Sequence, residues 1–162
     1  MNEQTFSRLV QEHQGMLYRV AYTFLHHPED CRDVLQDALI KAWRNSHTLR
    51  KPEAFRSWMI RIVVNCAKDA LRKKKIQTVE LTGDLSAPEA PVEDENLAAA
   101  LRQLEENLRL PIVLHYMEGL PVEEISRTMH LPQGTIKNRL FRGRKKLAET
   151  LSKFQKEAEA WN

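Results

Sequence analysis

Apolar residues recur at steps of three and four along most of this chain, which is the spacing of amphipathic helices. In the first half the pattern predicts three helices, over about residues 4–25, 29–46 and 53–75. Pro28 and Pro52 stand at the breaks between them, where a proline suits the first turn of the next helix. Three helices of this length can enclose a small core of modest stability.

The second predicted helix has two different faces. Its apolar face is expected to bury Val34, Leu35, Ala38, Leu39, Ala42 and Trp43. Its other face presents Asp33, Gln36, Asp37 and Ile40, which lie together on a helix surface. An ordered acidic and amide patch beside an exposed isoleucine suits protein docking. An ordinary solvated face is the alternative.

The third predicted helix carries a basic face opposite its apolar stripe. Arg61, Asn65, Lys68 and Arg72 line up there, close to Trp58. Cations with an amide among them and an aromatic ring beside them can hold a DNA backbone and touch bases.

Residues 76–96 show no sustained period and contain glycine, prolines and an acidic run, which predicts a flexible linker. Helical spacing resumes over about residues 97–106 and 110–117, with Pro111 expected in the first turn of the latter and Gly119 as its cap. After Leu151 the charged tail is expected to fray.

The last third has the pattern of a helix-turn-helix. A short helix is expected after Pro121, with Ile125 and Met129 on its apolar face, and His130 is suited to a left-handed turn. A second helix begins near Gln133, and its surface is rich in Lys and Arg. The second helix of such a motif enters the DNA major groove. A solvated helical hairpin with a basic face is the alternative.

Charge is segregated along the chain although the net charge is only +3. Residues 1–75 carry 14 Lys or Arg and 8 Asp or Glu; residues 76–108 carry 1 and 8, and residues 109–162 carry 10 and 6. Two basic blocks separated by an acidic one indicate two surfaces for a polyanion, most commonly nucleic acid. The sequence thus predicts an all-α chain. A three-helix domain (1–75) and a four-helix domain with the helix-turn-helix (97–162) are joined by an acidic linker (76–96).

Several classes of function are disfavoured. The chain has no Gly-rich phosphate loop and no protease or esterase motif, so we expect neither an enzyme nor a cofactor. Cys31 and Cys66 form no CxxC, and His26, His27 and Cys31 lack a fourth ligand at a metal-site spacing, so no metal is expected. No segment resembles a signal peptide or a membrane span, which predicts a cytoplasmic protein.

Three segments together resemble a bacterial RNA polymerase sigma factor of the extracytoplasmic-function (ECF) class of the sigma-70 family. Residues 33–43 resemble the segment that binds the polymerase clamp helices, and residues 55–65 the segment that melts and reads the −10 element. Residues 116–142 resemble the domain that reads the −35 element. The segments occur in family order, with the acidic linker between them.

The resemblance implies roles for individual residues. Core polymerase would contact Asp33, Gln36, Asp37 and Ile40. A base flipped from the −10 element would enter a pocket of Leu49, Arg50 and Lys51, and the opened strand would lie on Trp58, Arg61, Asn65 and Lys68. The −35 major groove would meet Thr135, Lys137, Asn138, Arg139, Phe141 and Arg142.

The resemblance also implies partners: core RNA polymerase, promoter DNA and a cognate anti-sigma factor, in a role that includes stress response. Two positions depart from the usual pattern, because His130 stands where the turn often has Gly and Asn138 where Ser is common. Two alternatives stay open from the residues alone. One is a stand-alone helix-turn-helix regulator, and the other is a helical adaptor that binds only proteins.

Overall fold

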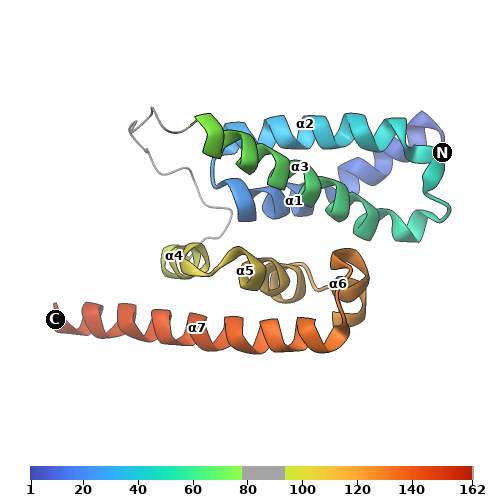
Figure 1. The fold of residues 1–162 in the computed structure, drawn as a ribbon. Helices are drawn as coiled ribbons and strands as arrows, with labels where there is room; N and C mark the ends of the chain where they lie inside the picture. Colours follow the sequence, from blue (N-terminus) through green and yellow to red (C-terminus); the bar gives the residue numbers. More distant parts are fainter. Residues whose placement is uncertain (78–93, 162) are drawn as a thin grey trace. The chain divides into compact units, whose positions relative to one another are not determined.

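The computed structural model describes residues 1–77 and 94–161, and every regular element within them is helical, so the predicted all-α fold is confirmed (Figure 1). The chain divides into two compact units, Met1–Glu89 and Ala90–Asn162. Helix α3 runs to Gln77 and α4 begins at Glu95, so both ends of the predicted linker are helical. The rest of that linker, residues 78–93, lies outside the described residues.

The N-terminal unit is a bundle of α1 (Glu3–Leu25), α2 (Pro28–Arg44) and α3 (Phe55–Gln77), each packed against the other two. Asn2 caps α1 by accepting the Thr5 N–H at 2.8 Å. His26 ends α1 in the left-handed conformation, with φ of 60°. The next helix then starts at Pro28, as the sequence predicts.

The core of this bundle comes from the apolar stripes of the three helices. Its fully buried side chains include Leu17 and Val20 of α1 and Phe55, Met59, Ile60 and Val63 of α3. Between α2 and α3 the chain makes two short 3-10 turns, Ser46–Thr48 and Pro52–Ala54. These turns bracket Leu49, Arg50 and Lys51.

The expectation that Trp43 is buried is wrong, because 43% of this residue is exposed. Its indole packs on one side against Phe6, with ring centroids 5.2 Å apart. Trp43 lies at the edge of the α2 face that meets the bundle, where a ring as large as indole is covered on one side only. The smaller Val34, Ala38 and Ala42 fill the centre of that face.

The C-terminal unit comprises α4 (Glu95–Gln103), α5 (Glu106–Ile112), the π-helical turn η3 (Val113–Met117), α6 (Val122–Met129) and α7 (Gln133–Ala160). Helix α7 packs against α4, α5 and α6. Its buried residues Ile136 and Leu140 join Leu108, Leu114, Leu120 and Ile125 in a single core. Gly119 closes η3 with φ of 71°, which agrees with its predicted role as a cap.

Two sequence expectations in this unit are wrong. Pro111 is the sixth residue of α5, beyond its first turn, and it is fully buried. A proline there removes one helical hydrogen bond, and the chain widens into η3 directly afterwards, where the Glu118 N–H donates to the Val113 carbonyl at 3.1 Å. The tail after Leu151 does not fray, since α7 continues to Ala160.

The turn between α6 and α7 has the predicted left-handed histidine. His130 has φ of 55°, and its N–H donates to the Ser126 carbonyl. The Leu131 N–H donates to the same carbonyl at 3.1 Å, and the Ser126 hydroxyl donates to the Leu131 carbonyl. These bonds satisfy the end of α6 and redirect the chain into α7 within three residues.

Candidate nucleic-acid and protein-binding surfaces

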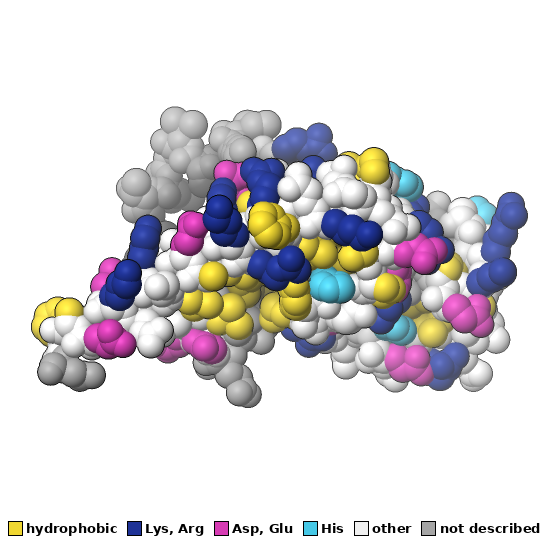
Figure 2. Space-filling view, turned by 90° about the horizontal axis from the view of Figure 1, so that it is seen from below, with side chains coloured by type: hydrophobic (Ala, Val, Ile, Leu, Met, Phe, Trp, Pro, Cys, Tyr) yellow, Lys and Arg dark blue, Asp and Glu magenta, His cyan; other side chains and the backbone are white. Residues whose placement is uncertain are grey.

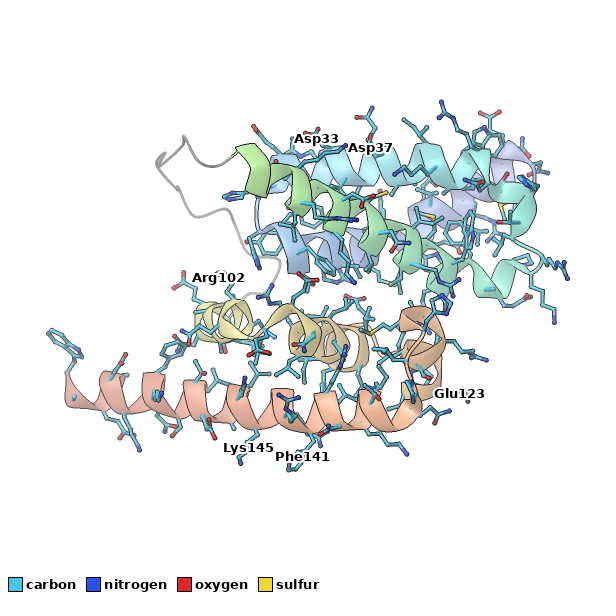
Figure 3. All side chains as sticks on the ribbon, viewed as in Figure 1. Asp33, Asp37, Arg102, Glu123, Phe141 and Lys145 are labelled. Carbon is cyan, nitrogen blue, oxygen red and sulfur yellow. The ribbon has the colours of Figure 1, made fainter. Side chains whose placement is uncertain are left out.

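The first half of α7 presents a solvent-facing surface opposite its buried residues. Asn138, Phe141, Arg142 and Lys145 follow one another at helical steps and are all exposed, and Phe141 is 59% exposed. Figure 3 shows Phe141 and Lys145 pointing away from α5 and α6. We call these four residues the outer face of α7.

The six residues predicted to meet the −35 element do not all share this face. Asn138, Phe141 and Arg142 lie on it, and the exposed Lys137 flanks it. Thr135 and Arg139 are half-buried on the other flank, toward the interior of the unit. Lys145 was not among the predicted residues, although its step of seven from Asn138 is a signal in the sequence.

Positive charge dominates this half of the helix. Between residues 133 and 148, α7 has no acidic residue and carries Lys137, Arg139, Arg142, Arg144, Lys145 and Lys146. Figure 2, which views the molecule from the side of α7, shows dark-blue Lys and Arg side chains along it. Such a field attracts a polyanion before any specific contact forms.

Two of these cations make contacts within the C-terminal unit. Arg144 Nη1 donates to the Tyr116 hydroxyl at 2.5 Å, and its guanidinium carbon lies 6.0 Å from the centre of the Tyr116 ring. Lys146 Nζ lies 3.5 Å from a carboxylate oxygen of Glu105. Both side chains therefore link α7 to the preceding part of the unit, whereas Arg142 and Lys145 lie on the outer face of α7.

The acidic patch predicted on α2 exists as a surface. Asp33, Gln36, Asp37 and Ile40 are all exposed, and Figure 3 shows Asp33 and Asp37 on the same side of α2. Trp43 extends this surface, because it follows Ile40 at the next helical step. Ile40 and Trp43, 44% and 43% exposed, form an apolar end to the patch. The sequence predicted the exposure of Ile40 but not that of Trp43.

A shallow polar pocket lies beside this patch, between α2 and α3. It is lined on one side by Asp33, Asp37 and Lys41 and on the other by Cys66, Asp69 and Lys73. Burial raises the pKa of the Cys66 thiol, which the neighbouring Lys41 only partly offsets. Burial raises the pKa of Cys31, in the same bundle, to about 11. Both thiols are therefore protonated at neutral pH.

The residues predicted to hold the opened strand lie in the loop before α3 and on one face of α3. Leu49 is half-buried, whereas Arg50 and Lys51 are exposed. On α3, Trp58 and Arg61 are half-buried and Asn65 and Lys68 are exposed. Trp58 packs against Phe55, with ring centroids 6.0 Å apart, so the aromatic residue beside the basic face is anchored in the core.

Two features of residues 1–77 and 94–161 bear on other functions. No group of three or more His, Cys, Asp or Glu side chains in these ranges could hold a metal ion. None of the helices described is long and apolar enough to cross a membrane.

Comparisons with known proteins identify both units. Family models described as Sigma-70 region 2 and Sigma-70 region 4 match residues 9–76 and 94–147. The chain is 31% identical to the RNA polymerase sigma-H factor of Pseudomonas aeruginosa, over 97% of this chain and 91% of that protein. It is 32% identical to the RNA polymerase sigma factor SigV of Bacillus subtilis, over 89% of each protein.

A third relative carries the class in its name. The chain is 30% identical to the ECF RNA polymerase sigma-E factor of Escherichia coli, over 88% of this chain and 84% of that protein. Among solved structures, the sigma factor RpoE of Bartonella quintana, in complex with the anti-sigma factor NepR, has the same fold. The TM-score is 0.77 at 22% identity, over 91% of this chain and 96% of that one.

CnrH, in complex with the cytosolic domain of CnrY, matches with a TM-score of 0.71 at 26% identity, over 93% of this chain and 90% of that one. The relatives, both family models and the fold agree. They favour neither a stand-alone regulator nor an adaptor. The chain belongs to the sigma-70 family as an ECF sigma factor, a non-catalytic subunit that binds core RNA polymerase and promoter DNA and directs transcription initiation.

Proposed function

We propose that the two units divide promoter recognition between them. Residues 1–75 bind core polymerase and the −10 element, residues 97–162 bind the −35 element, and residues 76–96 link the two. The matches of sigma-70 regions 2 and 4 to residues 9–76 and 94–147 support this division. The opposite charge of the middle segment supports it as well, because an acidic linker is repelled by the DNA that its neighbours bind.

The outer face of α7 is the observation that carries the −35 assignment. Arg142 pairs with guanine and Asn138 with adenine, since their side chains match the donor and acceptor patterns of those bases in the major groove. Phe141 offers an apolar contact to a thymine methyl group. Lys137 and Lys145 hold phosphates beside these contacts, and Thr135 and Arg139 support the inner flank of the helix.

The −10 element is bound by the loop before α3 and by the basic face of α3. Leu49, Arg50 and Lys51 receive a flipped base, and Trp58, Arg61, Asn65 and Lys68 hold the opened strand. The anchored ring of Trp58 supports this role, because a fixed aromatic surface stacks on a base without losing further side-chain freedom. Exposed Lys68 and Arg50 supply charge for phosphates.

Core polymerase docks on the α2 patch of Asp33, Gln36, Asp37 and Ile40, which Trp43 extends. The partner surface should be basic opposite the aspartates and apolar opposite Ile40 and Trp43. An exposed tryptophan beside an isoleucine gives this patch the aromatic anchor that protein interfaces favour.

The remaining assignments rest on relatives. Two proteins of this fold were solved with an anti-sigma factor or with the cytosolic domain of a second protein, which supports a cognate anti-sigma factor here. Membership of the ECF class also supports a cytoplasmic location and a role in stress response.

Run-off transcription tests the proposed function directly. The purified protein is added to core polymerase on fragmented genomic DNA of the source organism, and the 5′ ends of the transcripts are sequenced. Discrete starts that share a −35 and a −10 sequence and disappear without the protein are expected. Failure to bind core polymerase would overturn the docking assignment, and starts that share no −35 sequence would overturn the role of α7.

A further inference from the structure

Three aromatic residues meet where the connection between α2 and α3 leaves the bundle and rejoins it. Trp43 is the last residue but one of α2, and Phe55 is the first residue of α3. Phe6 of α1 contacts both, because its ring centroid lies 5.2 Å from that of Trp43 and 6.0 Å from that of Phe55. A single side chain of α1 therefore packs on both ends of this connection.

The geometry of these contacts suits Phe6 to hold both ends in place. Phe6 is only 9% exposed, and Phe55 is fully buried. The Phe6 ring is inclined by 60° to the indole of Trp43 and meets Phe55 edge to face, at 83°. The quadrupoles of aromatic rings favour such arrangements at these distances. Each contact thus favours one relative orientation of its two rings, in addition to burying apolar surface.

His13 supports Phe55 from the same helix. Its ring centroid lies 5.5 Å from that of Phe55, and its Nδ1 donates to the Leu9 carbonyl at 2.8 Å, which fixes the imidazole. Trp58, three residues after Phe55, packs against Phe55 in turn. The start of α3 is therefore held by α1, and the indole of Trp58 is held with it.

Hydrogen bonds within the connection shape its two turns. The Leu49 N–H donates to the Ser46 carbonyl at 3.2 Å, and the Ala54 N–H donates to the Lys51 carbonyl at 3.0 Å. Because each bond joins residues three apart, it sets the form of one turn and not the place of the loop on the bundle. That place is set where the connection meets the helices, at the two residues that Phe6 contacts.

We propose that Phe6 is a positioning residue for recognition of the −10 element. By holding Trp43 and Phe55 it fixes the loop of residues 49–51, a role that rests on the assignment of this loop to the flipped base. A binding pocket keeps its selectivity only when the packing around it locks its geometry. Phe6 acts through the loop and not by contact with DNA.

Fork-junction DNA with a single-stranded −10 region measures this role. It is taken from a promoter found by run-off transcription and is bound by holoenzyme formed with the full chain in excess over core polymerase. Each base of the non-template strand is replaced in turn by an abasic site, and the affinity for intact DNA is divided by the affinity for each abasic DNA. In wild type this ratio should be largest at one position, that of the flipped base. Because both affinities come from the same holoenzyme, the ratio does not depend on how tightly the chain binds polymerase.

Phe6→Leu keeps an apolar side chain but removes the ring, and it should lower the ratio at that position about 2–10-fold, the worth of one aromatic pair. Phe6→Tyr keeps the ring and should retain the wild-type ratio. Val20→Ala is the matched control, because Val20 is fully buried in the same helix but lies ~21 Å along it from Phe6. This control loosens the core away from the aromatic rings and should also retain the wild-type ratio. Thermal unfolding followed by circular dichroism checks that each variant is folded.

Leu49→Ala separates the role of Phe6 from the assignment on which it rests. It should lower the same ratio, because it removes part of the pocket itself. A wild-type ratio in Leu49→Ala, or no preferred position in wild type, would overturn the assignment of the loop and with it the role of Phe6. A reduced ratio in Leu49→Ala beside a wild-type ratio in Phe6→Leu would overturn the role of Phe6 alone. Losses in Val20→Ala or Phe6→Tyr that equal the loss in Phe6→Leu would overturn it as well.

Discussion

Gly143 of α7 lies so close to Ile112 of α5 that a Cβ atom at residue 143 would stand 2.8 Å from Ile112 Cγ1. Gly143 is buried, and the carbonyl of Leu108 is also near, at 3.6 Å from the same position. The absence of a side chain therefore sets how closely α7 packs on α5. Because the outer face of α7 lies opposite this contact, the glycine also fixes how that face is presented.

Gly143→Ala should destabilise the C-terminal unit by about 1–3 kcal/mol, because the added methyl group overpacks a filled contact. Urea unfolding followed by circular dichroism measures the change. Gly134→Ala is the matched control: it lies in the same helix, and nothing is within 4 Å of its added methyl group. Because residue 134 is only the second residue of α7, that variant should change the unfolding free energy by less than about 0.5 kcal/mol. Equal effects of the two substitutions would contradict the packing role of Gly143.

Arg109 should be needed to hold α4 in place. Its Nε donates to the Leu101 carbonyl at 2.8 Å, and Nη2 donates to the carbonyls of Leu104 at 2.6 Å and Arg102 at 3.2 Å. These carbonyls lie at the C-terminal end of α4. Burial of Arg109 against them lowers its pKa. Arg109→Met leaves the carbonyls without their charged donor and should cost about 2–4 kcal/mol in unfolding free energy.

Urea unfolding and amide hydrogen exchange in α4 check this expectation. Arg102→Ala, which removes an exposed side chain from the same helix, should change the unfolding free energy by less than about 0.5 kcal/mol. Wild-type stability and wild-type hydrogen exchange in α4 of the Arg109→Met protein would show that Arg109 does not cap α4.

Arg142 and Lys145 should differ in what they contribute to −35 binding. Arg142→Ala should cost about 1–3 kcal/mol on the preferred sequence and relax selectivity at one base pair. Lys145→Ala should weaken all sequences alike and reduce the slope of log K against log salt by about 1. Fluorescence anisotropy with duplexes changed at single positions separates the two, with Lys153→Ala as control. A sequence-dependent loss at Lys145 would reverse the assignment.

Asp37→Arg should weaken binding to core polymerase without unfolding the protein, because residue 37 is exposed on the α2 patch. Reversing one charge at a docking surface commonly costs several kcal/mol of binding through like-charge contact. Gln11→Arg, on the exposed side of α1, is the control and should bind as wild type does. Competition against a labelled sigma factor for core polymerase gives both affinities. Wild-type affinity of Asp37→Arg would count against the patch.

Stability of the N-terminal unit should fall at alkaline pH. The pKa of Cys31 is about 11 in the folded state, above its usual 9.0, because burial disfavours the thiolate. A raised pKa of this kind contributes stability that is present below pH 9 and is lost as pH rises through 11. Unfolding free energies at several pH values for wild type and Cys31→Ala measure the difference. Parallel pH profiles of the two proteins would exclude this thiol as a cause.

Local features of the fold were predictable from residue order. The apolar period places each helix, and the breaks follow from Pro28, Gly119 and His130, whose backbone preferences act within a few residues. The charge pattern and the helix-turn-helix spacing likewise predicted that α7 presents an exposed basic surface. Helical steps alone determine which side chains share a face.

Tertiary packing decided the rest. Trp43 is exposed because smaller residues fill the centre of its helix face, and Pro111 is tolerated inside α5 because the following turn widens. Among six neighbouring cations of α7, contacts with Tyr116 and Glu105 hold Arg144 and Lys146 toward the unit. A sequence period specifies which side chains share a face, but burial depends on the neighbours that the fold brings to that face.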